Sequence, residues 1–150
     1  MSSAYFSDNE KMKKCNVCAR DIPASARTCK YCGWVQHAQP VDPDKQYWDY
    51  NFVTLTKARQ LYAAGKPIQP DFGDFLKCMQ VYSELEFYCH DKHYGVLHLS
   101  DGTWHFYEWD ISDKGYQIYK SIEEFAEKAN IDNVLLKVLW DSVHSVGLAS

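Results

Sequence analysis

The spacing of hydrophobic residues changes twice along the chain. Apolar residues recur at helical spacing over 54–64 and again over 70–82, which predicts two helices. The first segment runs into the stop signal Gly65-Lys66-Pro67, and the second begins at Pro70-Asp71. Between 85 and 120 the period becomes two, and Tyr, Phe, Trp, Val and Ile are frequent, which predicts an antiparallel meander of about four strands.

Turn residues divide the predicted meander at 91–92, 101–102 and 113–115. Asp101-Gly102 favours a two-residue type I′ turn, because both residue types tolerate positive φ. Such a turn fixes the register of its hairpin. We expect these cross-strand pairs: Leu99 with Trp104, His98 with His105, Leu97 with Phe106, and Val96 with Tyr107. Leu97, Leu99, Trp104 and Phe106 would then share the core face.

Two further helices are predicted after the meander. Ser121, followed three residues later by Glu124, has the spacing of a capping box for a helix that ends near Ala129. A last helix is predicted over 131–146 from a stripe of apolar residues, Leu135, Val138, Leu139 and Val143. The predicted body is therefore an α+β fold with the order α-α-β-β-β-β-α-α, its helices packed on the antiparallel sheet.

The N-terminal part lacks these long periodic segments. Residues 1–11 are polar, and we expect a flexible tail. Residues 37–46 contain two prolines among polar residues and are interpreted as a linker. The predicted organisation is a tail at 1–11, a zinc ribbon at 12–36, a linker at 37–46 and an α+β domain at 47–150.

The ribbon is predicted from four cysteines. Cys15, Cys18, Cys29 and Cys32 form two Cys-x2-Cys pairs, the spacing that places two sulfurs of one knuckle on the same Zn²⁺. Gly33 after the last ligand suits a knuckle whose backbone N–H groups point at a thiolate. Four thiolates leave no open coordination position, so we expect one structural Zn²⁺ rather than a catalytic one.

The residues around these cysteines resemble a known family. Lys14-Cys15-Asn16-Val17-Cys18-Ala19-Arg20-Asp21-Ile22-Pro23 and Ala26-Arg27-Thr28-Cys29-Lys30-Tyr31-Cys32-Gly33-Trp34 are similar to the short four-cysteine zinc ribbons at the ends of many bacterial, phage and plastid proteins. Asn16 stands where proline is usual in that family, and Ala19 where glycine is usual. The resemblance covers residues 14–34 and implies an adaptor module, not an activity.

Charge is distributed unevenly. Residues 1–40 carry six Lys and Arg against three Asp and Glu, a net +3, whereas the remainder carries ten against seventeen, a net −7. A Zn²⁺ with four thiolates would lower the N-terminal value to about +1. Nucleic-acid binders neutralise many phosphates, so this balance disfavours that class. No apolar run of about 18 residues and no signal peptide is found, and we expect a soluble, cytoplasmic protein that does not bind membranes.

Aromatic residues in the ribbon have two interpretations. Trp34 and Tyr31 either form its small core or pack on the larger domain, or they anchor a protein partner on a docking face. The basic residues of the ribbon are the candidates for phosphate contact if nucleic acid is the partner: Lys11, Lys13, Lys14, Arg20, Arg27 and Lys30.

Other metal-capable or reactive residues have plain structural interpretations. The expected pair His98 and His105 could hold a metal, but the sequence places no third ligand beside it. The cluster Cys89-His90-Asp91-Lys92-His93 matches no metal-site spacing, and Cys78 is expected to be a buried core residue. A further signal is that Tyr107, Trp109 and Ile111 alternate with Trp104 and Phe106. A strand that is aromatic on both faces indicates either that helices cover both sides or that a bulge shifts the register, and an exposed remainder would be a binding surface.

A second resemblance lies in the C-terminal half. Residues 95–103, followed by Ser121-Ile122-Glu123-Glu124-Phe125, look like part of the cell-wall-regulator and toxin-immunity domains of the SMI1/KNR4 type. Ile122 stands where an aromatic residue is expected in those domains. The resemblance implies a toxin-immunity function.

The sequence contains no Gly-rich phosphate loop, no Gly-x-Ser-x-Gly motif and no His-Glu-x-x-His motif, and no small-molecule substrate is indicated. We therefore expect a non-catalytic adaptor or assembly subunit that binds a protein partner through the ribbon and the acidic α+β domain. The alternatives are a nucleic-acid-associated accessory factor and a toxin-immunity-like protein.

Overall fold

The chain divides into two compact units, residues 1–68 and 69–150. The computed structural model describes residues 11–48, 51–109 and 116–149. The tail up to residue 10 and the predicted turn at 113–115 therefore lie outside the described residues, as does Ile111. The boundary after Ile68 differs from the one predicted near 46, because a helix assigned to the larger domain belongs to the N-terminal unit.

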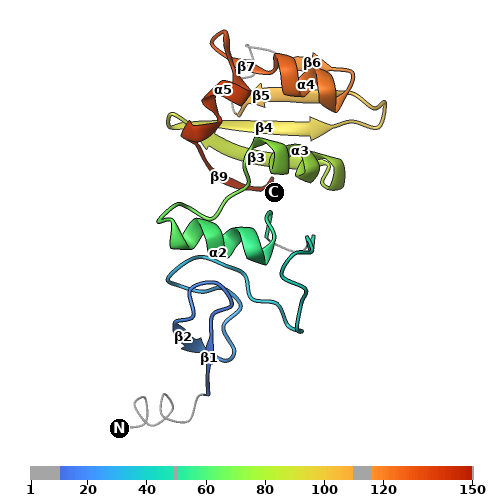
Figure 1. The fold of residues 1–150 in the computed structure, drawn as a ribbon. Coiled ribbons are helices and arrows are strands. Elements are labelled where there is room, and N and C mark those ends of the chain that lie inside the picture. Colours follow the sequence, from blue (N-terminus) through green and yellow to red (C-terminus); the bar gives the residue numbers. More distant parts are fainter. Residues whose placement is uncertain (1–10, 49–50, 110–115, 150) are drawn as a thin grey trace. The chain divides into compact units, whose positions relative to one another are not determined.

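The N-terminal unit combines short strands with one helix (Figure 1). Strand β1 (Met12–Lys14) pairs antiparallel with β2 (Asp21–Pro23). Helix α2 (Leu55–Ala63) begins where the Thr54 hydroxyl accepts a hydrogen bond from the Lys57 N–H at 3.1 Å. Two residues after the helix, Gly65 has a φ of 70°, and its N–H reaches the Tyr62 carbonyl at 3.0 Å.

The core of this unit joins the cysteine region to α2. Ile22, Cys15, Cys29 and Trp34 pack in one buried cluster with residues at the start of the helix, namely Val53, Leu55 and Ala58. The helix therefore covers a region too small to have an interior of its own. This shared core is the physical reason that the unit extends to Ile68.

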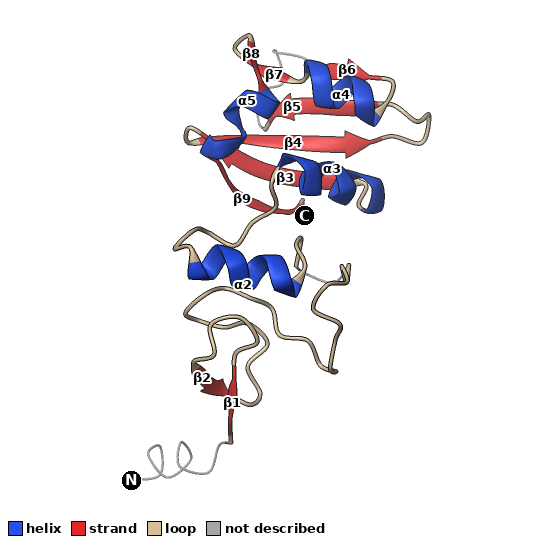
Figure 2. Ribbon diagram, in the orientation of Figure 1, coloured by secondary structure: helices blue, strands red, loops and turns tan. Residues whose placement is uncertain are grey.

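The C-terminal unit is an α+β fold built on a five-stranded antiparallel sheet (Figure 2). The strand order is β6-β5-β4-β3-β9. The strands are β3 (Glu84–Cys89), β4 (Lys92–His98), β5 (Trp104–Glu108), β6 (Gln117–Tyr119) and β9 (Val143–Leu148). The helices are α3 (Phe72–Val81), α4 (Ile122–Lys128) and the short α5 (Leu136–Leu139), which continues into the 3₁₀ turn η2 (Trp140–Ser142).

Rings from the helices and from one face of the sheet form the core of the C-terminal unit. Phe75 of α3 lies edge-on to Phe87 of β3, with centroids 5.6 Å apart. Phe125 of α4 meets Phe106 of β5 in the same way at 5.9 Å. Trp140 packs on Phe75 at 4.8 Å and donates its indole N–H to the Pro70 carbonyl at 3.0 Å. All described helices of this unit thus pack on the same face.

The β4–β5 hairpin differs from the predicted register by one residue. His98 pairs with Trp104, and Leu97 pairs with His105. The reason is the turn: only Gly102 has positive φ, at 89°, and its N–H reaches the Leu99 carbonyl at 3.0 Å, which makes a three-residue loop. The predicted core set is therefore wrong in part, since Val96 is buried and Leu97 is only half-buried.

A two-residue turn with positive φ at both positions occurs elsewhere in the sheet. His90 and Asp91, at φ 48° and 66°, connect β3 to β4, one residue before the turn predicted at 91–92.

The predicted last helix over 131–146 is wrong. Asp132 and Asn133, both at positive φ, close a small hairpin between β7 (Asn130–Ile131) and β8 (Val134–Leu135). Only four residues then form α5, and Val138 of the supposed apolar stripe is 66% exposed. The segment from Val143 instead pairs with β3 as an edge strand. Long-range strand pairing overrides the local helical pattern here.

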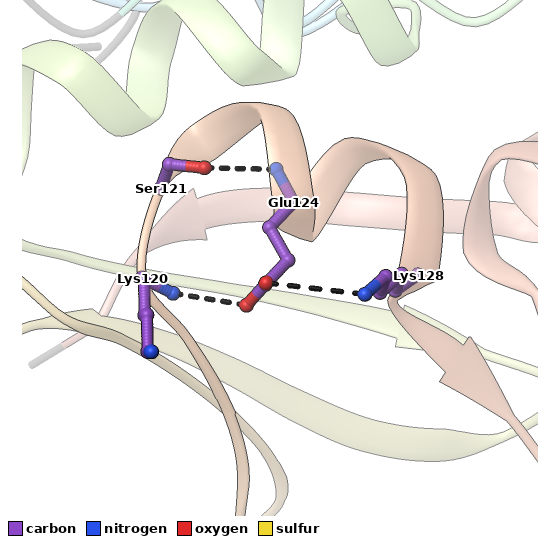
Figure 3. A network of polar contacts seen from close by, with 4 residues as sticks. All are labelled: Lys120, Ser121, Glu124 and Lys128. Carbon is purple, nitrogen blue, oxygen red and sulfur yellow. Dashed lines mark hydrogen bonds and ion pairs between the residues drawn. The ribbon is translucent and has the colours of Figure 1, made fainter.

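The predicted helix start at Ser121 is confirmed, but the return bond of the capping box goes to the residue before Ser121 (Figure 3). The Ser121 Oγ accepts from the Glu124 N–H at 3.0 Å. The Glu124 carboxylate turns back to accept from the Lys120 N–H at 3.1 Å, and its second oxygen lies 4.0 Å from the Lys128 ammonium. The Glu124 side chain thus caps the start of α4 and also contacts Lys128 in its last turn.

Candidate metal centre

Two tight turns of the same geometry place the four cysteines. In the first, the Ala19 N–H bonds to the Cys15 carbonyl at 3.0 Å, and the Val17 N–H points at the Cys15 sulfur at 3.4 Å. In the second, the Gly33 N–H bonds to the Cys29 carbonyl at 2.8 Å, and the Tyr31 N–H points at the Cys29 sulfur at 3.4 Å. Each Cys-x2-Cys pair thus forms a knuckle turn of the same geometry, the kind of turn that supplies thiolate ligands in four-cysteine metal sites.

The four sulfur atoms converge on one point. All of them lie within 4.8 Å of one another. Cys15 Sγ is 3.6 Å from Cys32 Sγ, and Cys18 Sγ is 3.6 Å from Cys29 Sγ. These distances exceed a disulfide bond of about 2.05 Å and are near the roughly 3.8 Å edge of a tetrahedron with metal–sulfur bonds of about 2.3 Å. Within the described residues this is the one cluster of three or more metal-capable groups, and it could hold a metal ion.

Side chains outside the two Cys-x2-Cys pairs hold the first knuckle in place. The Gln36 amide donates to the Cys15 sulfur at 3.4 Å and to the Trp34 carbonyl at 3.0 Å, and its oxygen accepts from the Asn16 N–H at 3.3 Å. The buried Asn51 pairs with both backbone groups of Val35, at 3.2 and 2.8 Å. Outer partners of this kind orient ligands and tune their basicity.

The electrostatics of the cluster favour a bound cation. Although burial works against ionisation, hydrogen bonds from Cys18, Val17 and Gln36 lower the pKa of Cys15 to about 7. Burial, together with the neighbouring thiols, raises the pKa of Cys32. Without a cation, therefore, the second thiolate is disfavoured by the first, and a divalent ion would remove that penalty.

The aromatic residues expected to bind a partner differ in exposure. Trp34 is 2% exposed and lies in the core of the N-terminal unit, so its interpretation as an exposed anchor is wrong. Tyr31 is 47% exposed, with the Arg20 guanidinium 4.8 Å and the Lys30 ammonium 5.2 Å from its ring centre.

The basic residues proposed to bind a partner lie at the surface. Lys13 and Lys14 lie on β1, and Lys14 forms an exposed ion pair with Asp21 at 2.7 Å. Arg27 is exposed.

The other candidate sites do not assemble. His98 and His105 are not a cross-strand pair, because the observed register places them on opposite faces of the sheet. His93 instead contacts Glu86, with Nε2 3.1 Å from the carboxylate. Burial raises the pKa of Cys89, and of Cys78 to about 12, so both remain thiols.

Sequence reasoning missed Gln36 and Asn51. The pattern of the sequence places Gln36 in the ribbon only as its last residue, and Asn51 in the larger domain. Polar residues of this kind are common in loops, and nothing in their spacing indicates a sulfur or a strand as the partner. Two prolines and a loop separate Asn51 from Val35 in the sequence, so only the folded chain brings them together.

No described helix is long and apolar enough to cross a membrane. Comparison with protein-family models, with curated proteins and with solved structures finds no match to this chain.

Proposed function

We propose that Cys15, Cys18, Cys29 and Cys32 bind one structural Zn²⁺ and that the chain is a non-catalytic adaptor for a protein partner. The observation that carries the metal proposal is the convergence of four sulfurs within 4.8 Å. Zn²⁺ prefers such a set of four soft ligands in a tetrahedron. A set of four protein ligands leaves no position for substrate or water, so the ion would act on folding alone.

Metal analysis of the purified chain tests the zinc proposal. We expect one zinc per chain, and loss of that zinc when Cys29 and Cys32 are both replaced by serine. Cys78→Ala is the matched control, because Cys78 is a buried cysteine outside the cluster and should leave the zinc content unchanged. Absence of zinc, or zinc retained by the double variant, would overturn the proposal.

The exposed Tyr31 supports the adaptor role. Its ring projects from the second knuckle, and the Arg20 and Lys30 cations lie over it at 4.8 and 5.2 Å. An aromatic ring with flanking arginine is the composition of interface hot spots, and the stacked cations restrict its motion before binding. A knuckle supported by a metal ion would hold the Tyr31 ring and its two neighbouring cations on a rigid backbone.

Partner capture from native extract, quantified by mass spectrometry, tests the adaptor role. Proteins bound to the parent chain should be lost with Tyr31→Ala, for which a penalty of about 2 kcal/mol or more is typical of a hot spot. Tyr62→Ala is the control, since Tyr62 is also exposed in this unit but lies on α2. Equal losses in both variants, or none in either, would contradict a binding role for Tyr31.

Nucleic acid is the second candidate partner, favoured by the same Tyr31 group and by its cations. A phosphate-driven complex weakens steeply between about 50 and 200 mM salt, whereas a protein complex anchored by an aromatic side chain need not. Replacement of Lys13 and Lys14 by glutamate would abolish binding of a labelled oligonucleotide but leave partner capture intact. If the parent chain binds no oligonucleotide at low salt, this candidate is eliminated.

A further inference from the structure

The C-terminal unit has a small cavity where β4, β5 and β6 meet the β7–β8 hairpin. Its volume is about 180 Å³. Tyr94 and Phe106 line it, and their rings pack on Phe87, so the cavity opens on the face of the sheet that carries the helices. This volume holds a group of several non-hydrogen atoms. It is below the roughly 300–1,000 Å³ of pockets for drug-sized ligands, which excludes a nucleotide or a large cofactor.

Hydrogen bonds fix the wall that the β7–β8 hairpin contributes. The Gln117 amide on β6 donates to the Asn130 carbonyl at 2.8 Å, and its oxygen accepts from the Asn130 N–H at 3.2 Å. The side-chain oxygen of Asn130 in turn accepts from the Asn133 N–H at 3.3 Å, across the turn that carries Asp132. The hairpin is therefore held against β6, with the exposed Asp132 at the rim of the cavity.

A buried hydroxyl without a partner lies at this cavity. Tyr94 is 5% exposed, and within the part of the chain that the structure describes no hydrogen bond is made by its hydroxyl. Buried polar side-chain groups are normally hydrogen-bonded. The Tyr94 hydroxyl is thus a hydrogen-bonding group that a molecule in the cavity can use. Water can satisfy such a group, so the charge of the lining decides which ligand is preferred.

The charge of the lining is negative. Glu108 is the cross-strand partner of Tyr94 and points to the same face, and Asp132 lies at the rim. Burial, reinforced by Glu108, Cys89 and Asp132, raises the pKa of Tyr94 to about 12, which places both carboxylates near its hydroxyl. None of the described residues that line the cavity is Lys, Arg or His. Residues 69–150 carry six Lys and Arg against fourteen Asp and Glu, a net −8. This charge repels anions and attracts cations.

The donors and acceptors present favour an organic cation over a metal ion. Among the described residues, Glu108 and Asp132 belong to no group of three or more metal-capable side chains. Ca²⁺ and Mg²⁺ need six or more oxygen ligands, which this lining does not supply. A primary ammonium has three N–H donors, whereas a guanidinium has five and would leave more of them unpaired here.

We infer that this cavity binds a primary alkylammonium group, which donates to the Tyr94 hydroxyl oxygen and to the Asp132 carboxylate. Its methylene chain would lie beside the Phe106 ring. A lysine side chain of another protein and a free diamine both offer this group, and each fits a space of several non-hydrogen atoms. The inference goes beyond the adaptor role proposed above and depends on neither the zinc nor Tyr31.

NMR titration of the full chain, as purified, with defined amines tests the inference. The probes are 1,4-diaminobutane and Nα-acetyl-lysine methylamide. The controls are tetramethylammonium, a cation without N–H donors, and Nα-acetyl-norleucine methylamide, which has the chain without the charge. We expect at least one amine to shift the Asn130 and Asp132 amide signals saturably at millimolar concentration, because few atoms make contact. The amine that binds more tightly identifies the source of the group.

Two conservative variants locate the site. Tyr94→Phe keeps the ring and should weaken amine binding by about tenfold, because it removes a hydrogen bond to a charged group. Asp132→Asn keeps a residue that tolerates positive φ and should weaken binding by a similar factor, even if Tyr94→Phe perturbs the fold. The matched controls are Tyr88→Phe, on the opposite face of the sheet, and Asp141→Asn, an exposed acid of η2. Both should change binding less than twofold.

Four outcomes would overturn the inference. These are the absence of saturable binding by either amine, equally tight binding of tetramethylammonium or the norleucine derivative, equal effects of the variants and their matched controls, and displacement of a bound amine by Ca²⁺ at equal ionic strength. Because the probes are defined, none of these outcomes depends on the zinc content of the chain or on whether Tyr31→Ala releases partners from extract.

Discussion

Ala19 and Gly33 occupy the same place in the two knuckles, directly after the second cysteine of each pair. Both have positive φ, 61° at Ala19 and 82° at Gly33. An alanine in this region of backbone conformation is strained by roughly 1–2 kcal/mol, whereas glycine is not. The departure from the zinc-ribbon pattern at Ala19 therefore has a measurable physical cost.

Ala19→Gly should stabilise the N-terminal unit by about 1 kcal/mol, because the relief of strain exceeds the entropy that glycine adds to the unfolded chain. Denaturant unfolding of the zinc-loaded chain, followed by a signal from this unit, measures the change. Ala24→Gly is the control, since Ala24 is exposed and does not have positive φ; it should be neutral or slightly destabilising. A loss of stability in Ala19→Gly would refute the strain argument.

Gln36 connects the cysteine cluster to the loop that follows it. Replacement by leucine removes the donor to the Cys15 sulfur and the acceptor for the Asn16 N–H. Outer partners of metal ligands typically contribute 10–100-fold to affinity, so zinc should bind about tenfold more weakly to Gln36→Leu. Competition with a chromophoric chelator measures this. Gln39→Leu, an exposed glutamine of the same loop, should keep the parent affinity.

At the scale of elements, helix starts follow local chemistry and strand pairing does not. Thr54, Asp71 and Ser121 each accept a hydrogen bond from the N–H three residues later, and each precedes a helix that was predicted within a few residues of its position. The β4–β5 register instead depends on which residue of the loop adopts positive φ, which the Asp-Gly pair alone leaves undecided.

Ser121→Ala should destabilise the C-terminal unit by about 0.5–2 kcal/mol, because the Glu124 N–H loses its acceptor at the start of α4. Ser121→Asp keeps an acceptor at the same place and should restore most of the loss. Thermal unfolding of both variants gives the comparison. If the two variants lose the same stability, the hydrogen bond in Figure 3 is not what stabilises the helix start.

At the scale of the whole molecule, the two compact units have separate cores and opposite charge. Residues 1–68 carry ten Lys and Arg against six Asp and Glu, a net +4, whereas residues 69–150 carry a net −8. The cysteine cluster shares its core with α2, so a metal bound there would support a part of the chain that extends well beyond the cysteines.

Removal of zinc should therefore unfold the N-terminal unit through α2 and leave the C-terminal sheet folded. The free energy of metal binding is folding free energy in small metal-supported domains. Here Val53, Leu55 and Ala58 lie in the same buried cluster as Cys15 and Cys29. Hydrogen exchange after chelation checks this residue by residue: amides of α2 should lose protection and those of β3 and β4 should keep it. Loss confined to residues 12–36 would show that α2 is independent of the cluster. Simultaneous loss of the sheet would show that the units fold as one.

Features with a local cause can be predicted from the sequence alone. Two Cys-x2-Cys pairs specify knuckles, Ser121 with Glu124 specifies a helix start, and a period of two specifies strands, because each depends on backbone geometry within a few residues. The α+β class follows from these elements. The sequence also shows aromatic residues on both faces of one strand, but it leaves open whether both faces are covered.

Features that depend on contacts between distant residues become visible only in the folded chain. Trp34 is buried in a cluster that includes Val53, Leu55 and Ala58, and the compact unit therefore extends to Ile68. The segment from Val143 is a strand because β3 offers it an unpaired edge, although its apolar spacing is helical. One face of the sheet stays uncovered by the described helices of its unit, because these helices all pack on the other face. In each case burial and strand pairing contribute more free energy than local propensity, and no short window of sequence contains both partners.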